Sequence, residues 1–391
     1  MDFEVPNQQR DIVETAQRLA RESLAPRADH YDQASVHPKE SWHAVWEGGL
    51  LAGTIPKQYG GLELDMLSYC MVVEKLAAGC TSTSMTVHMH STVMRFINAM
   101  ANDEQKSLYF SEVVKDGKLF GSWGSEPESR GGAAFRRTEI ARTNGGYLIN
   151  GEKHFCTMAG GAHRYLVHCS LKGANPDEAL LLALVPEDSP GLHLVGDWNT
   201  LGMRATISPS MSFQDCPVDD FAVLGEAGQS QRLGVGLAFG LGYAAVYLGA
   251  AQAALDFTVE YCRSHRFDPH PTLMAESLGV QRAVAEMTMT LDSARLILYQ
   301  SANRWADASL DNRAVLTARA KYVATQAALS VSSLAIQSVG GRSAHKRMPL
   351  ERIFRDIRTC TLMPPNMDQT TEIIGKAELG LLELMAASAQ I

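Results

Sequence analysis

The chain has 391 residues, of which 46% are hydrophobic and 20% are charged, and its formal net charge is -8. This balance is typical of a globular protein with enough apolar residues to fill two or three subdomains. The mildly acidic charge argues against nucleic acid or an anionic membrane as a main partner.

Seven cysteines are spread along the chain, and no two of them form a Cys-x-x-Cys pair. We therefore expect no metal site and no disulfide framework, and reduced thiols in a cytoplasmic protein. The segment Met1-Asp-Phe-Glu-Val-Pro6 lacks the basic and apolar regions of a secretion signal. The longest apolar stretch, Leu237–Leu255, contains three glycines and Gln252, so it predicts a buried helix rather than a membrane span.

The first part of the chain, residues 1–119, has a helical period. Ile12, Ala16 and Leu19 recur at the three- and four-residue spacing of one helix face. Asp65 and Asn102 stand where a helix N-cap is expected, because short polar side chains accept hydrogen bonds from the first free amides of a helix. Between them, Thr81–Ala99 predicts a helix rich in Met and His.

Residues 120–225 have a different pattern, in which short alternating runs are separated by turn residues. Tyr165-Leu-Val-His-Cys169 is one such run, and Asn144-Gly145-Gly146 is one such turn. Asn150-Gly151 lies between two strand-like runs and predicts a hairpin turn. This part of the chain is therefore expected to be a β domain.

The helical period returns in the last part of the chain, residues 226–391. Long helices are expected over Leu233–Ser264, Glu276–Ala306 and Asn312–Ser338, with a short one after Thr370. The order predicts an α+β protein with an N-terminal helical domain (1–119), a middle β domain (120–225) and a C-terminal four-helix bundle (226–391). No Gly-x-Gly-x-x-Gly stands between a strand and a helix, which argues against a Rossmann dinucleotide site.

The C-terminal part carries a specific pattern. Gln337-Ser-Val-Gly340-Gly341, Pro349-Leu-Glu351-Arg352 and Arg355-Asp356 follow one another in register. This pattern resembles the C-terminal signature of the acyl-CoA dehydrogenase family, which binds FAD between subunits. The resemblance implies a homotetramer or homodimer, with Gln337, Gly340 and Gly341 at the cofactor.

Two motifs of the middle domain extend the resemblance to this family. Gly121-Ser-Trp123-Gly-Ser125-Glu-Pro127 is similar to the family's Thr-Glu-Pro loop, which places Trp123 and the Ser125 hydroxyl near the flavin pyrimidine. Asn150-Gly-Glu-Lys153-His-Phe155-Cys-Thr157 is similar to its Asn-Gly-x-Lys segment. The resemblance implies that Phe155 is the aromatic wall of the flavin and that Thr157 is the donor at N5.

Other motifs match the family with departures. Tyr261-Cys-Arg-Ser-His265-Arg266-Phe267 resembles its Tyr-x-x-x-Arg motif, and implies pyrophosphate contacts for His265, Arg266 and Phe267 across a subunit interface. Leu201-Gly-Met-Arg204 resembles its Gly-x-Arg turn. Arg130-Gly-Gly stands in place of the family's usual Gly-Ser-Asp, which helps hold the CoA chain, so the acyl carrier is left open. Together with His88, Arg130 and Arg204 are the candidate substrate-binding residues.

The family's catalytic Glu-Gly-Thr is missing at its usual spacing, where this chain has Thr361-Leu-Met-Pro364-Pro365. The second family position for the base falls near Phe239, which is not acidic either. With about four inserted residues, Met367-Asp368-Gln-Thr370 takes the place of the motif, so that Asp368 is the candidate base and Thr370 a cofactor residue. Asp368 as a plain helix cap is the alternative, and Glu372 is a weaker candidate base.

The resemblance implies FAD-dependent oxidation of an acyl thioester, on CoA or on a carrier protein, to the enoyl thioester, with electrons passed to an electron-transfer flavoprotein or a similar acceptor. A flavin-dependent monooxygenase on the same fold, using reduced flavin and O2, is the alternative. Arg358-Thr-Cys-Thr361 before Pro364-Pro365 resembles such enzymes, as does a His on the Thr81–Ala99 helix, either His88 or His90. Both histidines are otherwise explained as core residues, and a flavoprotein that binds acyl chains with little turnover is a third alternative.

Overall fold

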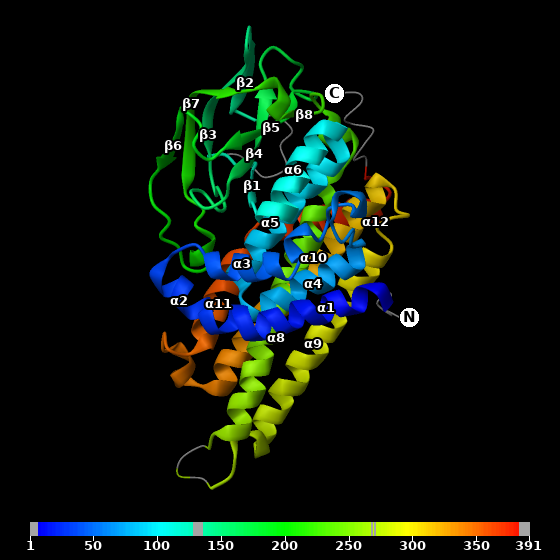
Figure 1. Ribbon diagram of the computed structural model, residues 1–391. Helices are drawn as coiled ribbons and strands as arrows, with labels where there is room; N and C mark the ends of the chain where they lie inside the picture. Colours follow the sequence, from blue (N-terminus) through cyan, green and yellow to red (C-terminus); the bar gives the residue numbers. More distant parts are fainter. Residues whose placement is uncertain (1–6, 128–135, 267–268, 270, 383–391) are drawn as a thin grey trace.

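The computed structural model describes residues 7–127, 136–266, 269 and 271–382. Helices occupy both ends of the described chain, and one sheet lies between them in sequence and stands above the helices in Figure 1. This order confirms the α+β class and the expected succession of helical, β and helical domains. The secondary structure changes from helix to strand between Asp116 and Phe120, and returns to helix after Leu224.

The N-terminal domain is built from helices whose caps follow the sequence pattern. The Asp65 carboxylate accepts a hydrogen bond from the Ser68 N–H at 2.8 Å, and Asn102 and Gln105 cap the next helix but one reciprocally. Both predicted N-caps are therefore confirmed. The helices are α1 (Asn7–Leu19), α2 (Ala25–Ala34), α3 (Lys39–Glu47), α4 (Met66–Gly79), α5 (Thr81–Met100) and α6 (Asp103–Asp116).

In the described part of the chain, eight strands form one sheet in the order β6-β7-β3-β2-β4-β5-β8, with β1 paired to β4. Pairing is antiparallel except where β1 and β2 run parallel to β4. The strands are β1 (Phe120–Trp123), β2 (Glu139–Thr143), β3 (Gly146–Lys153), β4 (Arg164–Leu171), β5 (Leu180–Pro186), β6 (Leu192–Val195), β7 (Ser210–Val218) and β8 (Val223–Leu224).

The predicted hairpin turn at Asn150-Gly151 is wrong. Strand β3 runs through both residues to Lys153, and the β2–β3 hairpin turns at Asn144-Gly145 instead. Pairing of β3 with β7 shifts register between Ile149 and Gly151, where the glycine has φ of 138°. Gly151 therefore lies beside a β-bulge. A residue at this point needs a positive φ, as a residue of a tight turn does, and glycine adopts it without strain.

The C-terminal domain is organised around α8 (Phe239–Ser264), which packs against α4, α9, α10 and α11. Val235–Ser264 is the one helical segment of the described residues that is long and apolar enough to cross a membrane, and 72% of its most apolar window is buried inside the protein. Burial explains its composition as that of a core helix. The other helices are α7 (Gln229–Arg232), α9 (Leu278–Asn303), α10 (Leu310–Val339), α11 (Pro349–Cys360) and α12 (Met367–Glu378).

Close contact between α8 and α4 depends on a glycine. A Cβ on Gly249 would lie 2.1 Å from the Glu74 backbone oxygen and 2.7 Å from the Ala77 side chain. No side chain fits at that distance, so the absence of a Cβ lets the two buried helices approach each other.

We predict that Gly249→Ala destabilises the protein by about 1–3 kcal/mol, because the added methyl group forces α8 away from α4. The matched control is Gly375→Ala on α12, where a Cβ would meet nothing within 4 Å. That change is expected to be neutral or to stabilise by up to about 1 kcal/mol through helix propensity. Chemical denaturation of the two variants checks this, and equal effects would contradict the packing argument.

Candidate active site

Three predicted cofactor residues, Ser125, Phe155 and Thr157, come together where β1 and β3 end. The His154 N–H donates to the Ser125 backbone oxygen at 2.9 Å. The Trp123 indole N–H donates to the Thr157 backbone oxygen at 3.0 Å. These two bonds join segments about thirty residues apart into one wall, which we call the β-domain wall: Ser125, Phe155 and Thr157.

The Phe155 ring is the uncovered part of this wall. It is 65% exposed, with the neighbouring His154 ring at 5.9 Å and the edge-on Trp198 ring at 6.4 Å between centroids. Its φ of 53° lies in the left-handed region, which a residue in a regular strand does not adopt. Phe155 is therefore not strand core. An open aromatic face beside two hydroxyl residues fits the ring of a flavin, as the sequence resemblance implies.

A buried ion pair supports the wall from behind. The Lys153 ammonium lies 2.6 Å from the Glu126 carboxylate, and both side chains are at most 2% exposed. The other Glu126 oxygen accepts the Arg137 N–H at 2.7 Å. Burial opposes the ionisation of Glu126, but Lys153 and the backbone donors hold the pKa of the carboxyl below its ordinary value. The pair therefore stays charged and fixes the turn that carries Ser125.

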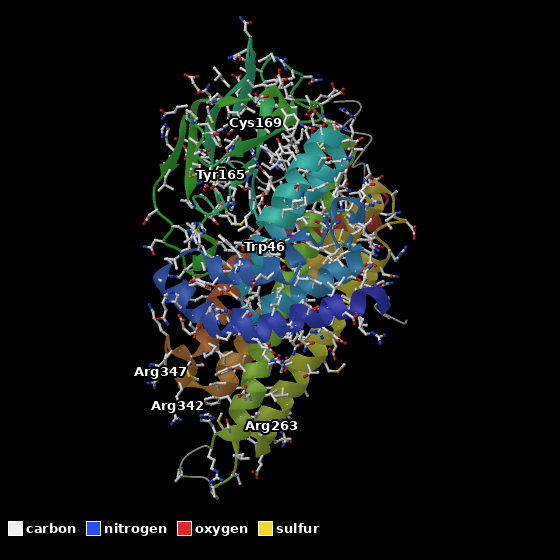
Figure 2. The ribbon with its side chains drawn as sticks, in the orientation of Figure 1. Trp46, Tyr165, Cys169, Arg263, Arg342 and Arg347 are labelled. Atoms are coloured by element: carbon white, nitrogen blue, oxygen red, sulfur yellow. The ribbon has the colours of Figure 1, made fainter. Side chains whose placement is uncertain are left out.

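A second group of predicted cofactor residues lies in the C-terminal helical domain, apart from the β-domain wall. The His265 ring stacks on Tyr261 at 3.7 Å at the C-terminus of α8, and Arg266 and Gln337 are exposed. A Cβ on Gly340 or Gly341 would meet nothing within 4 Å. In Figure 2 the neighbouring Arg263 and Arg342 lie at the lower end of the helical domain, whereas Tyr165, which stacks on Trp123, lies in the β domain above. Phe267 lies outside the described residues.

Lys321 of α10 holds the segment that precedes α12. This side chain is 1% exposed, and its Nζ donates to the backbone oxygens of Met363 and Pro365, both at 2.6 Å. The Tyr243 and Tyr247 rings lie 5.9 and 5.4 Å from Nζ. Burial lowers the pKa of Lys321 to about 8, so the ammonium form prevails at pH 7.

The start of α8 has no room for a catalytic carboxylate. Position 239 is a phenylalanine, and a Cβ on Gly240 would lie 2.3 Å from the Thr317 methyl group and 3.7 Å from Lys321. The same lysine therefore contacts both family positions for the base: the start of α8 and the segment before α12. Neither of these two positions carries an acid in this chain.

Asp368 is the exposed second residue of α12. The cap of this helix is Asn366, whose Oδ1 accepts the Gln369 N–H at 2.9 Å, so the alternative that Asp368 is the cap is wrong. Thr370 is buried, and its hydroxyl donates to the Met367 oxygen at 2.8 Å. Because Asp368 is not occupied as a cap, its carboxylate remains a candidate base, and this role stays a prediction.

Both candidate histidines of α5 use both ring nitrogens inside the protein. His88 lies 3.1 Å from the Phe239 oxygen through Nε2 and 2.7 Å from the Tyr69 hydroxyl through Nδ1. His90 bonds the Leu51 oxygen through Nε2 and accepts the Phe120 N–H through Nδ1. Burial lowers the pKa of His88 to about 3 and that of His90 to about 4, so both rings are neutral at pH 7.

Arg204 lies in a pocket of about 240 Å³ that is lined by residues of α2, of α11 and of the loop that precedes α11. Its Nε–H donates to the backbone oxygen of Asp32 at 2.9 Å. In the same pocket, the Arg355 guanidinium bonds the carboxylates of both Asp32 and Glu351. These contacts tie the β domain to the helices, and a substrate role for Arg204 stays a prediction. Arg130 lies outside the described residues.

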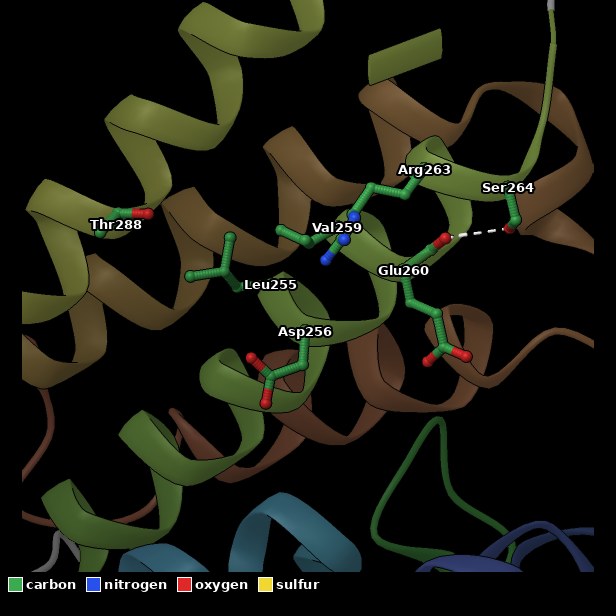
Figure 3. Close-up of a pocket in the computed structure, with 7 residues that line it drawn as sticks. All are labelled: Leu255, Asp256, Val259, Glu260, Arg263, Ser264 and Thr288. Atoms are coloured by element: carbon green, nitrogen blue, oxygen red, sulfur yellow. Dashed lines mark hydrogen bonds between the residues drawn. The ribbon is translucent and has the colours of Figure 1, made fainter. Parts of the chain in front are cut away.

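A shallow hollow of about 540 Å³ on α8 and α9 is lined by Asp256, Glu260, Arg263 and Thr288 among others (Figure 3). It lies at the end of α8 that carries His265, away from the β-domain wall. Among the residues that the structure describes, no group of three or more His, Cys, Asp or Glu side chains is placed to hold a metal ion.

Two buried cations were missed from the sequence, although each had a signal. Arg95 is the one Asp, Glu, Lys or Arg in the sequence Thr81–Met100, and Lys321 is the last such residue of α10. A lone charge on an otherwise apolar or small-residue helix face is uncommon, because burying it costs free energy unless a partner is supplied.

The fold and these residues were compared with known proteins. Family models match in three consecutive parts: the acyl-CoA dehydrogenase N-terminal domain at residues 6–116, the middle domain at 122–216 and the C-terminal domain at 241–363. These matches, in the order of the three observed domains, define a flavin oxidoreductase of the kind that acts on CH–CH groups. The chain belongs to the acyl-CoA dehydrogenase family.

Individual relatives agree with this family. The mitochondrial short-chain specific acyl-CoA dehydrogenase of Rattus norvegicus is 30% identical over 91% of this chain and 86% of its own length. Butyryl-CoA dehydrogenase from Megasphaera elsdenii superposes with a TM-score of 0.89 at 25% identity, covering 97% of this chain and all of the other. Dibenzothiophene monooxygenase (TdsC) from Paenibacillus sp. A11-2 superposes with a TM-score of 0.84 at 25% identity, covering 95% and 97%.

We predict that Lys321→Met loosens the segment before α12, because two buried backbone oxygens lose their donor. The expected loss of stability is about 1–3 kcal/mol. Hydrogen exchange of the Met363 and Met367 amides is expected to accelerate. The matched control is Lys376→Met, whose exposed ammonium pairs with Glu372, and about 0.5 kcal/mol or less is expected there. Equal exchange in both variants would contradict the role of Lys321.

Proposed function

We propose that this protein oxidises an acyl thioester to the enoyl thioester with bound FAD. The observation that carries the proposal is the open Phe155 ring, held with Ser125 and Thr157 at the junction of the β domain and the helices. When bound, the flavin supplies the hydride acceptor. Phe155 supports its ring, and the Ser125 and Thr157 hydroxyls lie where they are able to donate to its polar edge.

A second copy of the chain completes the proposed cofactor site. The β-domain wall belongs to the β domain, whereas Arg263 and Arg342, which neighbour His265, Arg266 and the paired glycines in sequence, lie at the lower end of the helical domain (Figure 2). The family resemblance implies that both groups contact one flavin dinucleotide. A partner subunit that brings its own α8 end and Gly340-Gly341 to the first subunit's wall would satisfy both, which supports a homodimer or homotetramer.

Asp368 is the proposed base that removes the proton from the α carbon. A carboxylate is the side chain that this step requires near neutral pH, and Asp368 is exposed in the first turn of α12. Lys321 positions the segment before it through the Met363 and Pro365 oxygens. The electrons then pass to an electron-transfer flavoprotein or a similar acceptor, and the acyl carrier is CoA or a carrier protein.

A monooxygenase is the second candidate, because TdsC superposes over nearly the whole chain. The monooxygenase alternative needs a histidine N–H that is free to donate to an oxygen species or to a substrate, and neither His88 nor His90 meets this need. Phe239 offers His88 only an acceptor, so Nε2 carries the proton and Nδ1 accepts from Tyr69. His90 is used in the same way by Leu51 and Phe120. Neither neutral ring has an N–H left to donate to an oxygen species or to a substrate.

The experiment that separates the two is an anaerobic titration of the FAD-loaded protein with acyl thioesters of different chain length. Bleaching of the flavin absorbance without another reductant is expected for at least one thioester. Absence of bleaching with every thioester, together with oxygen uptake when reduced flavin is supplied, would replace dehydrogenation by monooxygenation.

We predict that Asp368→Asn lowers the rate of this bleaching by about 10²–10⁴-fold, because the proton acceptor is lost. FAD content is expected to stay unchanged, as measured by the absorbance ratio of flavin to protein. The matched control is Glu372→Gln, another exposed acid of α12, which pairs with Lys376 and is expected to leave the rate unchanged. A full rate in the Asp368 variant removes this residue as the base.

A further inference from the structure

Arg95 stands out among the charged residues of the helical core. It lies on α5, and its guanidinium carbon is 4.5 Å from the centroid of the Tyr69 ring on α4. The residue keeps part of its surface accessible, but its Nη2 is buried and has no hydrogen-bond partner. A guanidinium offers five N–H donors, and a buried donor without an acceptor is costly.

No protein carboxylate compensates this charge among the described residues. The groups that act on Arg95 electrostatically are Tyr69 and Cys70. Burial raises the pKa of the Cys70 thiol to about 12 and raises the pKa of Tyr69 further, so neither is an anion at neutral pH. Other buried arginines do have such partners: Arg295 bonds Glu74, and Arg352 bonds Asp29.

The neighbouring hydrogen-bonding groups are neutral, so they supply no negative charge either. The Tyr69 hydroxyl and the His88 ring are occupied by each other, and Nε2 of His88 is occupied by the Phe239 oxygen. Burial and the positive charge of Arg95 together lower the pKa of His88 to about 3. A bound anionic ligand would supply the negative charge that the described residues around Arg95 do not.

The position of Arg95 connects it to the proposed active site. The next residue, Phe96, lies 6.3 Å from the Phe239 ring and 5.6 Å from the His168 ring. His168 in turn lies under Gly124, beside the turn that carries Ser125. The His88 ring meets the Tyr243 ring at 5.1 Å, and Tyr243 faces Lys321. Arg95 is linked to the start of α8 through Tyr69, whose ring it faces and whose hydroxyl bonds His88, and through His88, whose Nε2 lies 3.1 Å from the Phe239 oxygen.

We propose that Arg95 binds a carboxylate carried by the acyl group, so that the substrate is the monothioester of a dicarboxylic acid. This inference rests on the proposed function, because it places the acyl group beside the start of α8. A guanidinium and a carboxylate pair through two parallel N–H···O bonds, which would satisfy the orphaned Nη2. Tyr69 supports the guanidinium from its other face.

The test measures binding rather than turnover. Dissociation constants are determined from the flavin absorbance of the FAD-loaded protein, without oxygen, for pairs of pantetheine thioesters with equal carbon number: malonyl and propionyl, succinyl and butyryl, glutaryl and pentanoyl. Wild-type protein is expected to prefer the carboxylated member of at least one pair by roughly 10–100-fold, the range of a charge-assisted hydrogen bond. Arg95→Met is expected to abolish this preference, and Arg95→Lys to keep part of it.

Stability distinguishes a ligand-binding arginine from a structural one. Arg95→Met is expected to keep or raise the thermal midpoint, because it removes an uncompensated buried charge. The matched control, Arg295→Met, is expected to lower the midpoint, because the buried Glu74 carboxylate loses its only cationic partner among the described residues and keeps just the Tyr299 hydroxyl. If Arg95→Met instead lowers the midpoint as much and no wild-type preference exists, Arg95 is structural and the inference is overturned.

The two proposals fail in different ways. Flavin bleaching by neutral thioesters, without any preference for carboxylated ones, overturns the role of Arg95 and leaves the proposed oxidation intact. A preference that depends on Arg95, without bleaching by any thioester, supports the anion site and overturns the oxidation.

Discussion

The hydrogen bonds from Lys321 to the Met363 and Pro365 oxygens are the constraint on which the candidate active site depends. They hold the segment between α11 and α12 against α10, next to Gly240 on α8. The Lys321 ammonium is buried, so water does not replace the two backbone oxygens as its acceptors. The segment between α11 and α12 is therefore favoured in the one position that keeps both hydrogen bonds. The first turn of α12, with Asp368 and Thr370, follows from that position.

Among the described residues, most ionisable groups in the helical interior beside the candidate active site are neutral or paired with an opposite charge. Two cations, Arg95 and Lys321, are the exceptions. His88 and His90 are neutral and fully hydrogen-bonded, and the described carboxylates of the core are paired, as Glu74 is with Arg295 and Tyr299. Against this background Arg95 is a cation without an anion, and Lys321 is a cation satisfied by carbonyl oxygens. Lys321 faces Tyr243 near the start of α8, where the acyl group is proposed to lie, and Arg95 is linked to the same place through Tyr69 and His88.

Much of the fold could be predicted from the sequence, because the helix period and the caps at Asp65 and Asn102 are local signals. The turn at Asn150-Gly151 could not, because a strand that faces a β-bulge uses the same residue types as a hairpin, and only the pairing of β3 with β7 decides between them. The wall residues were found through motif resemblance. Arg95 and Lys321 were not, because their importance depends on which side chains surround them in space, and the sequence shows only that each is alone on its helix face.

The measurement that tests this account most directly is a crystal structure of the FAD-loaded protein with a thioester analogue that cannot be oxidised, such as one with sulfur at the β position. The account predicts the Asp368 carboxylate within roughly 3.5 Å of the α carbon, the distance of a reactive arrangement. It also predicts the Met363 and Pro365 oxygens still bonded to Lys321. An Asp368 side chain directed to solvent, with no carboxylate of either subunit near the α carbon, would contradict it.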